Sequence, residues 1–188
     1  MSSPLTNINT EWSLFLDRDG VINKRIPGDY VKNCAEFVLL PDVVEALKIF
    51  SELFRHIFVV TNQQGIGKGL MTESELAVVH NFMTSEIEKG GGRIDRVYYS
   101  PYLESAHHHT RKPAPGMALQ AKNDFPAIRF NHSIMVGDSI SDMMFGKNLD
   151  MTTVFISDDM QLCREHYKII DYCFPSLYEF AKTLINSN

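Results

Sequence analysis

The chain has 188 residues, of which 44% are hydrophobic and 22% are charged, and its formal net charge is -5. This composition excludes a disordered chain and supplies enough apolar surface for one buried core, so we expect a single domain over residues 1–188. The acidic balance, without a dense run of lysine and arginine, argues against a nucleic acid or an anionic membrane as the partner.

The cysteines and the hydropathy of the chain indicate its compartment. Cys34, Cys163 and Cys173 have neither the spacing of a disulfide framework nor that of a zinc ribbon, so we expect reduced thiols. Residues 2–11 lack the charged start and apolar centre of a signal peptide, and no run of about 18 apolar residues crosses a membrane. These features predict a cytoplasmic protein.

Short apolar runs alternate with amphipathic segments, which is typical of an α/β domain with a parallel sheet. In chain order, the pattern first predicts a strand at 13–16, a helix at 41–54, a strand at 56–60, a helix from 72 to the glycines at 90–92 and a strand at 96–99. It then predicts a helix from 115 to 126, a strand at 133–136, a helix after 139, strands at 152–156 and 169–174, and a helix at 177–185. Thr72 with Glu75, and Ser139 with Asp142, match capping boxes at two helix starts.

Four polar clusters follow predicted strands, at residues 17–20, 61–63, 111–113 and 137–142. Open α/β sheets bind their ligands at the carboxyl ends of their parallel strands. Carboxylates, small polar donors and a cationic pair gathered there are the groups that phosphoryl transfer requires. We therefore expect one phosphoryl-transfer site at this edge of the sheet.

The sequence DRDG at residues 17–20 ends the first predicted strand with two carboxylates. Because side chains two residues apart on a strand point the same way, Asp17 and Asp19 can face one phosphoryl group and one magnesium ion. The alternative interpretation is an ordinary Asp-Gly turn, in which Gly20 supplies unusual backbone angles.

The second cluster offers hydrogen-bond donors. Thr61 and Asn62 can donate to phosphoryl oxygens, or they can simply end the strand by bonding to the backbone. Glycines at 65, 67 and 69 allow close approach of a ligand. They do not form a nucleotide P-loop, because Gly69 follows Lys68 where serine or threonine is required.

The last two clusters add a cation pair and a third carboxylate. Lys112 can offset the negative charge gathered at an attacking carboxylate and a phosphate, and Arg111 can grip a distant part of the substrate bidentately. The alternative is a solvated cation pair before a helix. A capping box explains Ser139 and Asp142 but leaves Asp138 to complete a hard-metal site.

With these clusters, the chain resembles the phosphatases of the haloacid dehalogenase superfamily, whose four motifs match DRDG at 17–20, Thr61, Lys112 and Asp138. The longer sequences DRDGVIN, TNQQGIG, RKPAPGM and MVGD, which begin at positions 17, 61, 111 and 135, resemble the branch of heptose 1,7-bisphosphate and histidinol phosphatases. This resemblance implies a Rossmannoid three-layer α/β sandwich with a mainly parallel central sheet and a minimal cap domain or none.

The resemblance also implies a magnesium-dependent phosphomonoester hydrolase that works through an aspartyl-phosphate. Asp17 matches the nucleophile and Asp19 the general acid and base, while Thr61 and Lys112 match the residues that stabilise the phosphoryl group. The implied magnesium ligands are the carboxylates of Asp17 and Asp138 and the main-chain carbonyl of Asp19. The implied substrate contacts come from Asn62, Gln63, Gln64, Arg111 and Ser139.

The expected substrate is a small phosphorylated metabolite, D-glycero-D-manno-heptose 1,7-bisphosphate, which would lose its 7-phosphate on a monomeric enzyme. Histidinol phosphate is the alternative substrate. A polynucleotide 3'-phosphatase is disfavoured because no basic cluster is present to bind the nucleic-acid backbone. A receiver-like signalling module is disfavoured by Asp19, since a lasting phospho-signal gains nothing from a hydrolytic acid and base.

Asp19 must carry a proton when the leaving group departs. We therefore expect burial and the neighbouring carboxylates to raise its pKa.

Many relatives of this family hold a structural zinc ion in the loop before the Arg-Lys pair, using three cysteines and a histidine. The corresponding positions here are Ser100, Tyr102, His108 and Thr110, so we expect no structural zinc. The chain also departs from its relatives at Lys68, where they carry arginine, at Ser139, where they carry lysine, and in a longer segment at 24–29.

Overall fold

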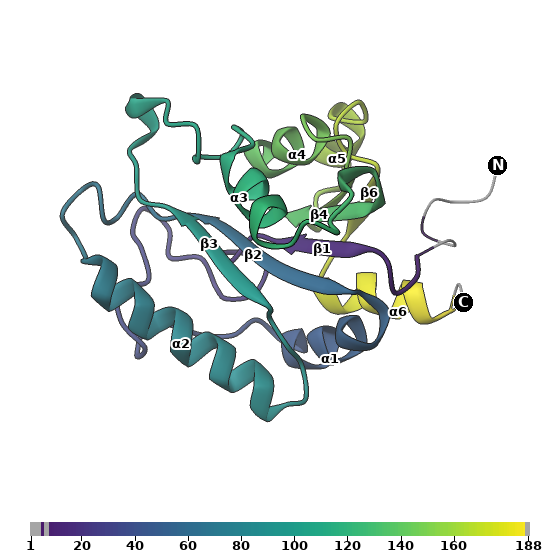
Figure 1. The fold of residues 1–188 in the computed structure, drawn as a ribbon, viewed down its shortest axis with the longest axis horizontal. Helices are drawn as coiled ribbons and strands as arrows, with labels where there is room; N and C mark the ends of the chain where they lie inside the picture. Colours follow the sequence, from purple (N-terminus) through teal and green to yellow (C-terminus); the bar gives the residue numbers. More distant parts are fainter. Residues whose placement is uncertain (1–4, 6–7, 187–188) are drawn as a thin grey trace.

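The computed structural model describes residue 5 and residues 8–186, and their six strands form one sheet in the order β3-β2-β1-β4-β5-β6 (Figure 1). Every neighbouring pair of strands is parallel. The strands are β1 (Ser13–Leu16), β2 (His56–Asn62), β3 (Arg96–Ser100), β4 (Ser133–Gly137), β5 (Thr152–Ile156) and β6 (Tyr172–Phe174). This arrangement confirms the predicted parallel sheet.

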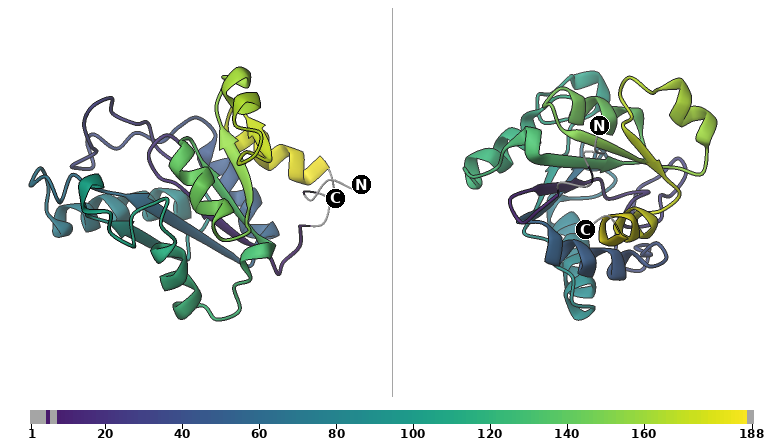
Figure 2. Two further views of the ribbon diagram at one scale, coloured as in Figure 1. Left: turned by 90° about the horizontal axis from the view of Figure 1, so that it is seen from above. Right: turned by 90° about the vertical axis from the view of Figure 1, so that its right-hand side faces the viewer.

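Helices cover both faces of the sheet, which completes a three-layer sandwich (Figure 1). The helices α1 (Val43–Leu53), α2 (Glu73–Lys89) and α6 (Leu177–Asn186) lie on one face, and α3 (Gly116–Asp124), α4 (Ile140–Lys147) and α5 (Met160–Glu165) lie on the other. On the first face α6 lies beside α1 (Figure 2). The ring centroids of Phe50 on α1 and Phe180 on α6 are 5.4 Å apart.

The strand β1 shows how the sequence produces these layers. Its four residues are all buried, and successive side chains point to opposite faces of the sheet. Leu14 and Leu16 belong to the core under α1, α2 and α6, whereas Phe15 belongs to the core that includes Met117 of α3 and Phe145 of α4. A strand buried on both faces is continuously apolar, which explains the uninterrupted run before Asp17.

Most predicted elements are confirmed, with shifts at their ends. The first helix begins at Val43 and not at residue 41, because Asp42 before it has a positive φ of 58°. The sixth strand begins at Tyr172 and not at residue 169. The helix α5 was not predicted; the side chain of Asp159 caps it by accepting hydrogen bonds from the backbone of its first turn. Both predicted capping boxes are present.

The expectation of three reduced thiols is wrong, because a disulfide joins Cys163 of α5 to Cys173 of β6. The turn between the two elements brings their Cα atoms to 6.3 Å, within the range that a disulfide bridges. Only Cys34 is free among the described cysteines. The argument for a reducing compartment from cysteine usage therefore does not hold.

Two further observations bear on the sequence predictions. Between β1 and α1 the described chain makes isolated bridges, Asp19 with Asn23 and Asn23 with Leu39, and adds no further sheet or helix there. None of the helices in the described part of the chain has the length and apolar character needed to cross a membrane.

Candidate active site

The four polar clusters meet at the carboxyl edge of the sheet, around a cavity of about 380 Å³. The central strands β1, β2 and β4 end there, because they are neighbours in a parallel sheet. Of the ten side chains predicted to form the site, eight line the cavity: Asp17, Asp19, Thr61, Asn62, Gln64, Arg111, Lys112 and Ser139. Gln63 is fully buried and bonds to Asp19 and Thr61, and Asp138 lies close to two lining residues, Asp17 and Asp142.

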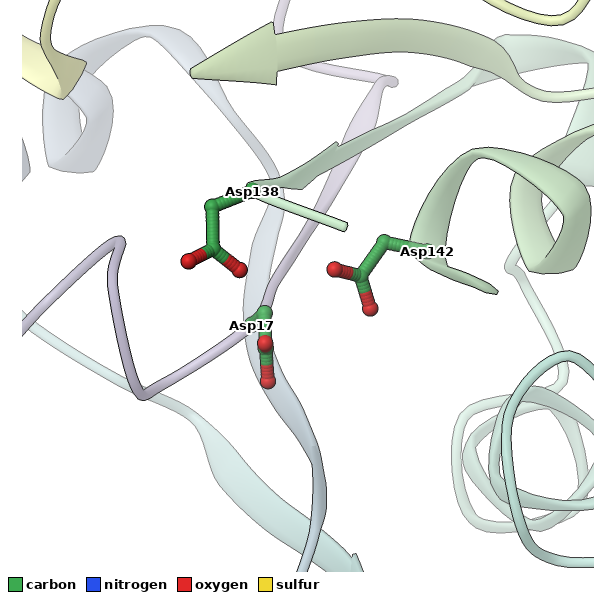
Figure 3. Close-up of side chains that lie close together, drawn as sticks. All are labelled: Asp17, Asp138 and Asp142. Carbon is green, nitrogen blue, oxygen red and sulfur yellow. The ribbon is translucent and has the colours of Figure 1, made fainter. Parts of the chain in front are cut away.

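Asp17, Asp138 and Asp142 form a carboxylate cluster, whose nearest carboxylate oxygens all lie within 4.8 Å of one another. Figure 3 shows the three side chains lying close together. Three carboxylates at this spacing are the oxygen ligands that a hard divalent cation takes. The sequence analysis assigned Asp142 only to a helix cap. Its position four residues after Asp138, at the start of a helix, was the signal that both could face one site.

Lys112 is the buried cation of this cluster, with 3% of its surface exposed. Its Nζ lies 2.8 Å from Oδ1 of Asp17 and 2.6 Å from Oδ1 of Asp142, and it donates to the carbonyl of Val60 at 2.7 Å. Burial alone would lower the pKa of Lys112, but the two carboxylates outweigh burial and raise it. Lys112 is therefore charged, and its single positive charge is shared between two of the three carboxylates.

Two of these carboxylates, those of Asp17 and Asp138, bind protons more tightly than isolated aspartates. Burial raises the pKa of Asp17 to about 6, with repulsion from Asp142 and Asp19 adding to the effect and Lys112 opposing it. Burial and repulsion from Asp17 raise the pKa of Asp138 to about 7, against the charge of Arg25. The cluster holds more negative charge than its cations neutralise, which is the electrostatic condition for binding a metal ion.

Gly20 forms the turn after β1 and also makes room for a side chain of the site. It has a positive φ of 94°, which favours glycine. A Cβ at this position would overlap the carboxylate of Asp138. Gly20 therefore lets β1 turn away while the carboxylate of Asp138 packs directly against the backbone.

Asp19 does not have the raised pKa that the sequence analysis expected. Burial by itself would raise its pKa, but the charge of Arg18 and hydrogen bonds from Asn23, Arg18 and Gln63 outweigh burial and lower it. Arg18 donates to both oxygens, at 3.0 and 2.9 Å, and Asn23 and Gln63 each donate at 2.9 Å. The expectation was wrong because it counted neighbouring carboxylates and overlooked the adjacent arginine.

Arg18 is itself fully buried, which is rare for arginine unless it is paired. Besides Asp19, its guanidinium contacts Nε2 of His80 on α2 at 3.1 Å. Burial, followed by the charge of Arg18, lowers the pKa of His80 to about 3, so the imidazole is neutral and its Nε2 can accept this hydrogen bond. Neither Arg18 nor His80 was identified from the sequence.

Asn62 and Gln63, at and just after the end of β2, hydrogen-bond to other residues of the site. Gln63 donates from Nε2 to Oγ1 of Thr61 at 2.8 Å as well as to Asp19. The side-chain amide of Asn62 donates to the carbonyl of Lys112 at 3.1 Å, and its oxygen accepts from the Lys112 backbone at 3.0 Å. Asn62 therefore fixes the backbone that carries Lys112.

The four positions that correspond to zinc ligands in relatives bond to one another. Thr110 contacts Ser100 at 3.1 Å through the two hydroxyls and His108 at 2.8 Å through Nδ1, and the Tyr102 ring stacks on His108 with centroids 3.5 Å apart. Hydroxyls and one imidazole do not match the thiolate-rich donor set of a structural zinc site. Arg111 contacts the same loop, because its Nη1 donates a hydrogen bond to the Tyr102 carbonyl at 3.3 Å.

Comparisons with known proteins identify the family of the chain. A family model described as HAD-hydrolase-like matches residues 109–179. A D-glycero-alpha-D-manno-heptose-1,7-bisphosphate 7-phosphatase of Mycobacterium tuberculosis is 37% identical over 171 residues, covering 91% of this chain and 90% of its own. The enzyme of the same name from Campylobacter jejuni is 37% identical over 147 residues, covering 78% and 83%.

A solved structure shows the same fold. The D,D-heptose 1.7-bisphosphate phosphatase from B. bronchiseptica, crystallised with magnesium and phosphate, superposes with a TM-score of 0.84 over 94% of this chain and 99% of that one, at 22% identity. Together with the identity to the curated relatives, this likeness confirms the resemblance found in the sequence. The chain belongs to the haloacid dehalogenase-like hydrolases, in the family of the heptose-1,7-bisphosphate 7-phosphatases, and is a phosphatase.

Proposed function

We propose that the protein removes the 7-phosphate from D-glycero-α-D-manno-heptose 1,7-bisphosphate through a phosphorylated Asp17. The observation that carries this proposal is the buried contact of Lys112 with Asp17, which lines the cavity and lies close to Asp138. A carboxylate held against a buried ammonium group is positioned to attack an anionic phosphate that would otherwise repel it. The names of the two relatives at 37% identity support the α anomer.

In the first step an oxygen of Asp17 attacks phosphorus in line, forming an O–P bond while the P–O bond to the sugar breaks. The departing sugar oxygen takes a proton from Asp19. In the second step Asp19 removes a proton from water, and the resulting hydroxide attacks phosphorus, releasing inorganic phosphate and free Asp17. Lys112 and Thr61 offset the charge on the phosphoryl oxygens in both steps.

The lowered pKa of Asp19 suits the second step, in which it acts as a base. For the first step it must be protonated. A bound phosphate brings negative charge into the same cavity, and a like charge nearby raises the pKa of a carboxyl group. We propose that substrate binding supplies this shift and that Arg18 and Gln63 hold the carboxylate between the two steps.

Magnesium fits the donor set of this site. The carboxylates of Asp17 and Asp138 and the main-chain carbonyl of Asp19 would hold it, and it would supply positive charge that compensates the transferring phosphoryl group. The residues themselves provide the oxygen atoms and an unneutralised negative charge, as the raised pKa values of Asp17 and Asp138 indicate.

The rest of the substrate is proposed to contact the cavity wall. Arg111 and Lys68 line the wall and can pair with the 1-phosphate, and Asn62, Gln64 and Ser139 can bond to sugar hydroxyls. Gln63 is proposed to act by holding Asp19 and Thr61 in place.

The proposal is tested by assaying the purified protein with magnesium on both anomers of the heptose bisphosphate, on histidinol phosphate and on a 3'-phosphorylated oligonucleotide. We expect the α anomer of the bisphosphate to have the highest kcat/KM and the product to retain its 1-phosphate. Preference for histidinol phosphate or for the oligonucleotide would overturn the assigned substrate, and loss of the 1-phosphate would overturn the assigned position.

A further inference from the structure

Arg25 occupies an unexpected place beside the carboxylate cluster. It belongs to the segment between β1 and α1, and its Nη2 donates to Oδ1 of Asp138 at 2.6 Å and to the main-chain oxygen of Asp19 at 3.2 Å. Those two oxygens are among the proposed metal ligands. One positively charged group therefore contacts two ligands that a divalent cation would use.

The two cations of the cluster differ in how firmly they are held. The Lys112 side chain is only 2% exposed, and it contacts the carboxylates of Asp17 and Asp142. The Arg25 side chain is 50% exposed, and its partner Asp138 is 17% exposed. Exposed ion pairs contribute little to stability because water screens them, so Arg25 can leave at small cost and Lys112 cannot.

The backbone around Arg25 is fixed, so a side-chain rotation is enough to release the contact. On one side the Lys24 backbone donates to the Val38 carbonyl at 2.8 Å. On the other side Ile26 packs against the main core, and its carbonyl accepts from Asp29 at 3.2 Å. Both flanking residues are anchored, and Arg25 between them lines the open cavity into which its side chain can turn.

We propose that Arg25 is a displaceable internal counter-cation: it binds Asp138 and the Asp19 carbonyl in the metal-free protein, and it must leave before a divalent cation can take these ligands. The two positive charges exclude each other from the same oxygens. Arg25 therefore weakens metal binding while it keeps the acidic cluster partly neutralised without metal. This inference rests on the ligands assigned in the proposed function.

The test measures magnesium affinity of the free protein by calorimetry, without substrate or turnover. Removing an exposed ion pair should tighten magnesium binding about two- to five-fold in Arg25→Gln. The matched control is Lys24→Gln, which removes the same charge from the adjacent exposed residue, whose side chain makes no hydrogen bond to the cluster among those described. Arg25→Lys keeps a cation and should change the affinity less than Arg25→Gln.

Tighter binding in Arg25→Gln with little change in Lys24→Gln supports the proposal. Equal or weaker binding in Arg25→Gln overturns it, and so does an equal gain in both variants, which would indicate only a long-range effect of net charge. If the parent and all variants fail to bind magnesium, the proposed metal site fails together with this inference. Melting curves of the metal-free variants establish that each is folded.

Discussion

Lys112 and Asp142 form an ion pair of 2.6 Å in which the side chains are 2% and 0% exposed. Asp17 is the second carboxylate partner of Lys112, at 2.8 Å. In Asp142→Asn the lysine keeps only one carboxylate partner, so its position in the site is less firmly fixed. We expect kcat to fall on the order of 10- to 100-fold.

A steady-state assay with the α-heptose bisphosphate measures this effect of Asp142→Asn. The asparagine side chain can still accept hydrogen bonds at the start of α4, so we expect a melting temperature close to that of the parent. An unchanged kcat would show that Asp142 serves only as a helix cap.

Gly20→Ala should inactivate the protein through Asp138. The substitution places a Cβ where the Asp138 carboxylate lies, at a positive φ of 94°. Gly69→Ala is the matched control, because Gly69 also has a positive φ, of 70°, but a Cβ there meets nothing within 4 Å. Both variants should lose about 1 kcal/mol of stability from backbone strain. Only Gly20→Ala should lose activity and magnesium binding; equal activity in the two variants would contradict the assigned role of Asp138.

The raised pKa values of Asp17 and Asp138 predict how stability depends on pH. In the metal-free folded protein these groups titrate at about 6 and about 7, whereas in the unfolded chain aspartate titrates near 3.9. Between about pH 4 and pH 7 the folded state binds more protons, so these groups make the metal-free protein less stable as the pH rises.

Melting curves of the metal-free protein at about pH 5 and about pH 8 measure this dependence. We expect the difference to shrink in Asp138→Asn, which no longer titrates there. Because magnesium binds ionised carboxylates, its stabilising effect should be larger at the higher pH. A metal-free protein whose Asp138→Asn variant shows the same pH dependence as the parent would contradict this account of the cluster.

The stacked and hydrogen-bonded loop around Tyr102 should keep its shape without zinc. Elemental analysis of metal-depleted and reloaded protein is expected to find no tightly held zinc. Tyr102→Ala removes the ring that stacks on His108 and loosens the carbonyl that accepts from Arg111. We therefore expect Tyr102→Ala to raise KM more than it lowers kcat. One tightly bound zinc per chain, or a loss confined to kcat, would contradict this interpretation.

The sequence was sufficient to predict the parallel sheet and to predict that the polar clusters lie close together. The run at 14–16 is apolar because β1 is buried on both faces, and parallel strands must bring Asp17 and Asp138 to one edge. The sequence could not predict which distant side chains the three-dimensional packing brings into contact. Arg18 and His80 are 62 positions apart in the sequence, and no local sequence pattern predicts their contact. The same holds for the disulfide between Cys163 and Cys173 and for Arg25 beside Asp138.

The central claim is that Asp17 carries the phosphoryl group during turnover. Borohydride reduces an aspartyl-phosphate but not a free carboxylate, so quenching the enzyme with borohydride during turnover of the α-heptose bisphosphate marks the phosphorylated residue. The account predicts that mass spectrometry finds the reduced residue at position 17 in the parent and that Asp17→Asn is folded, inactive and unmarked. Reduction at another residue, or turnover by Asp17→Asn, would contradict it.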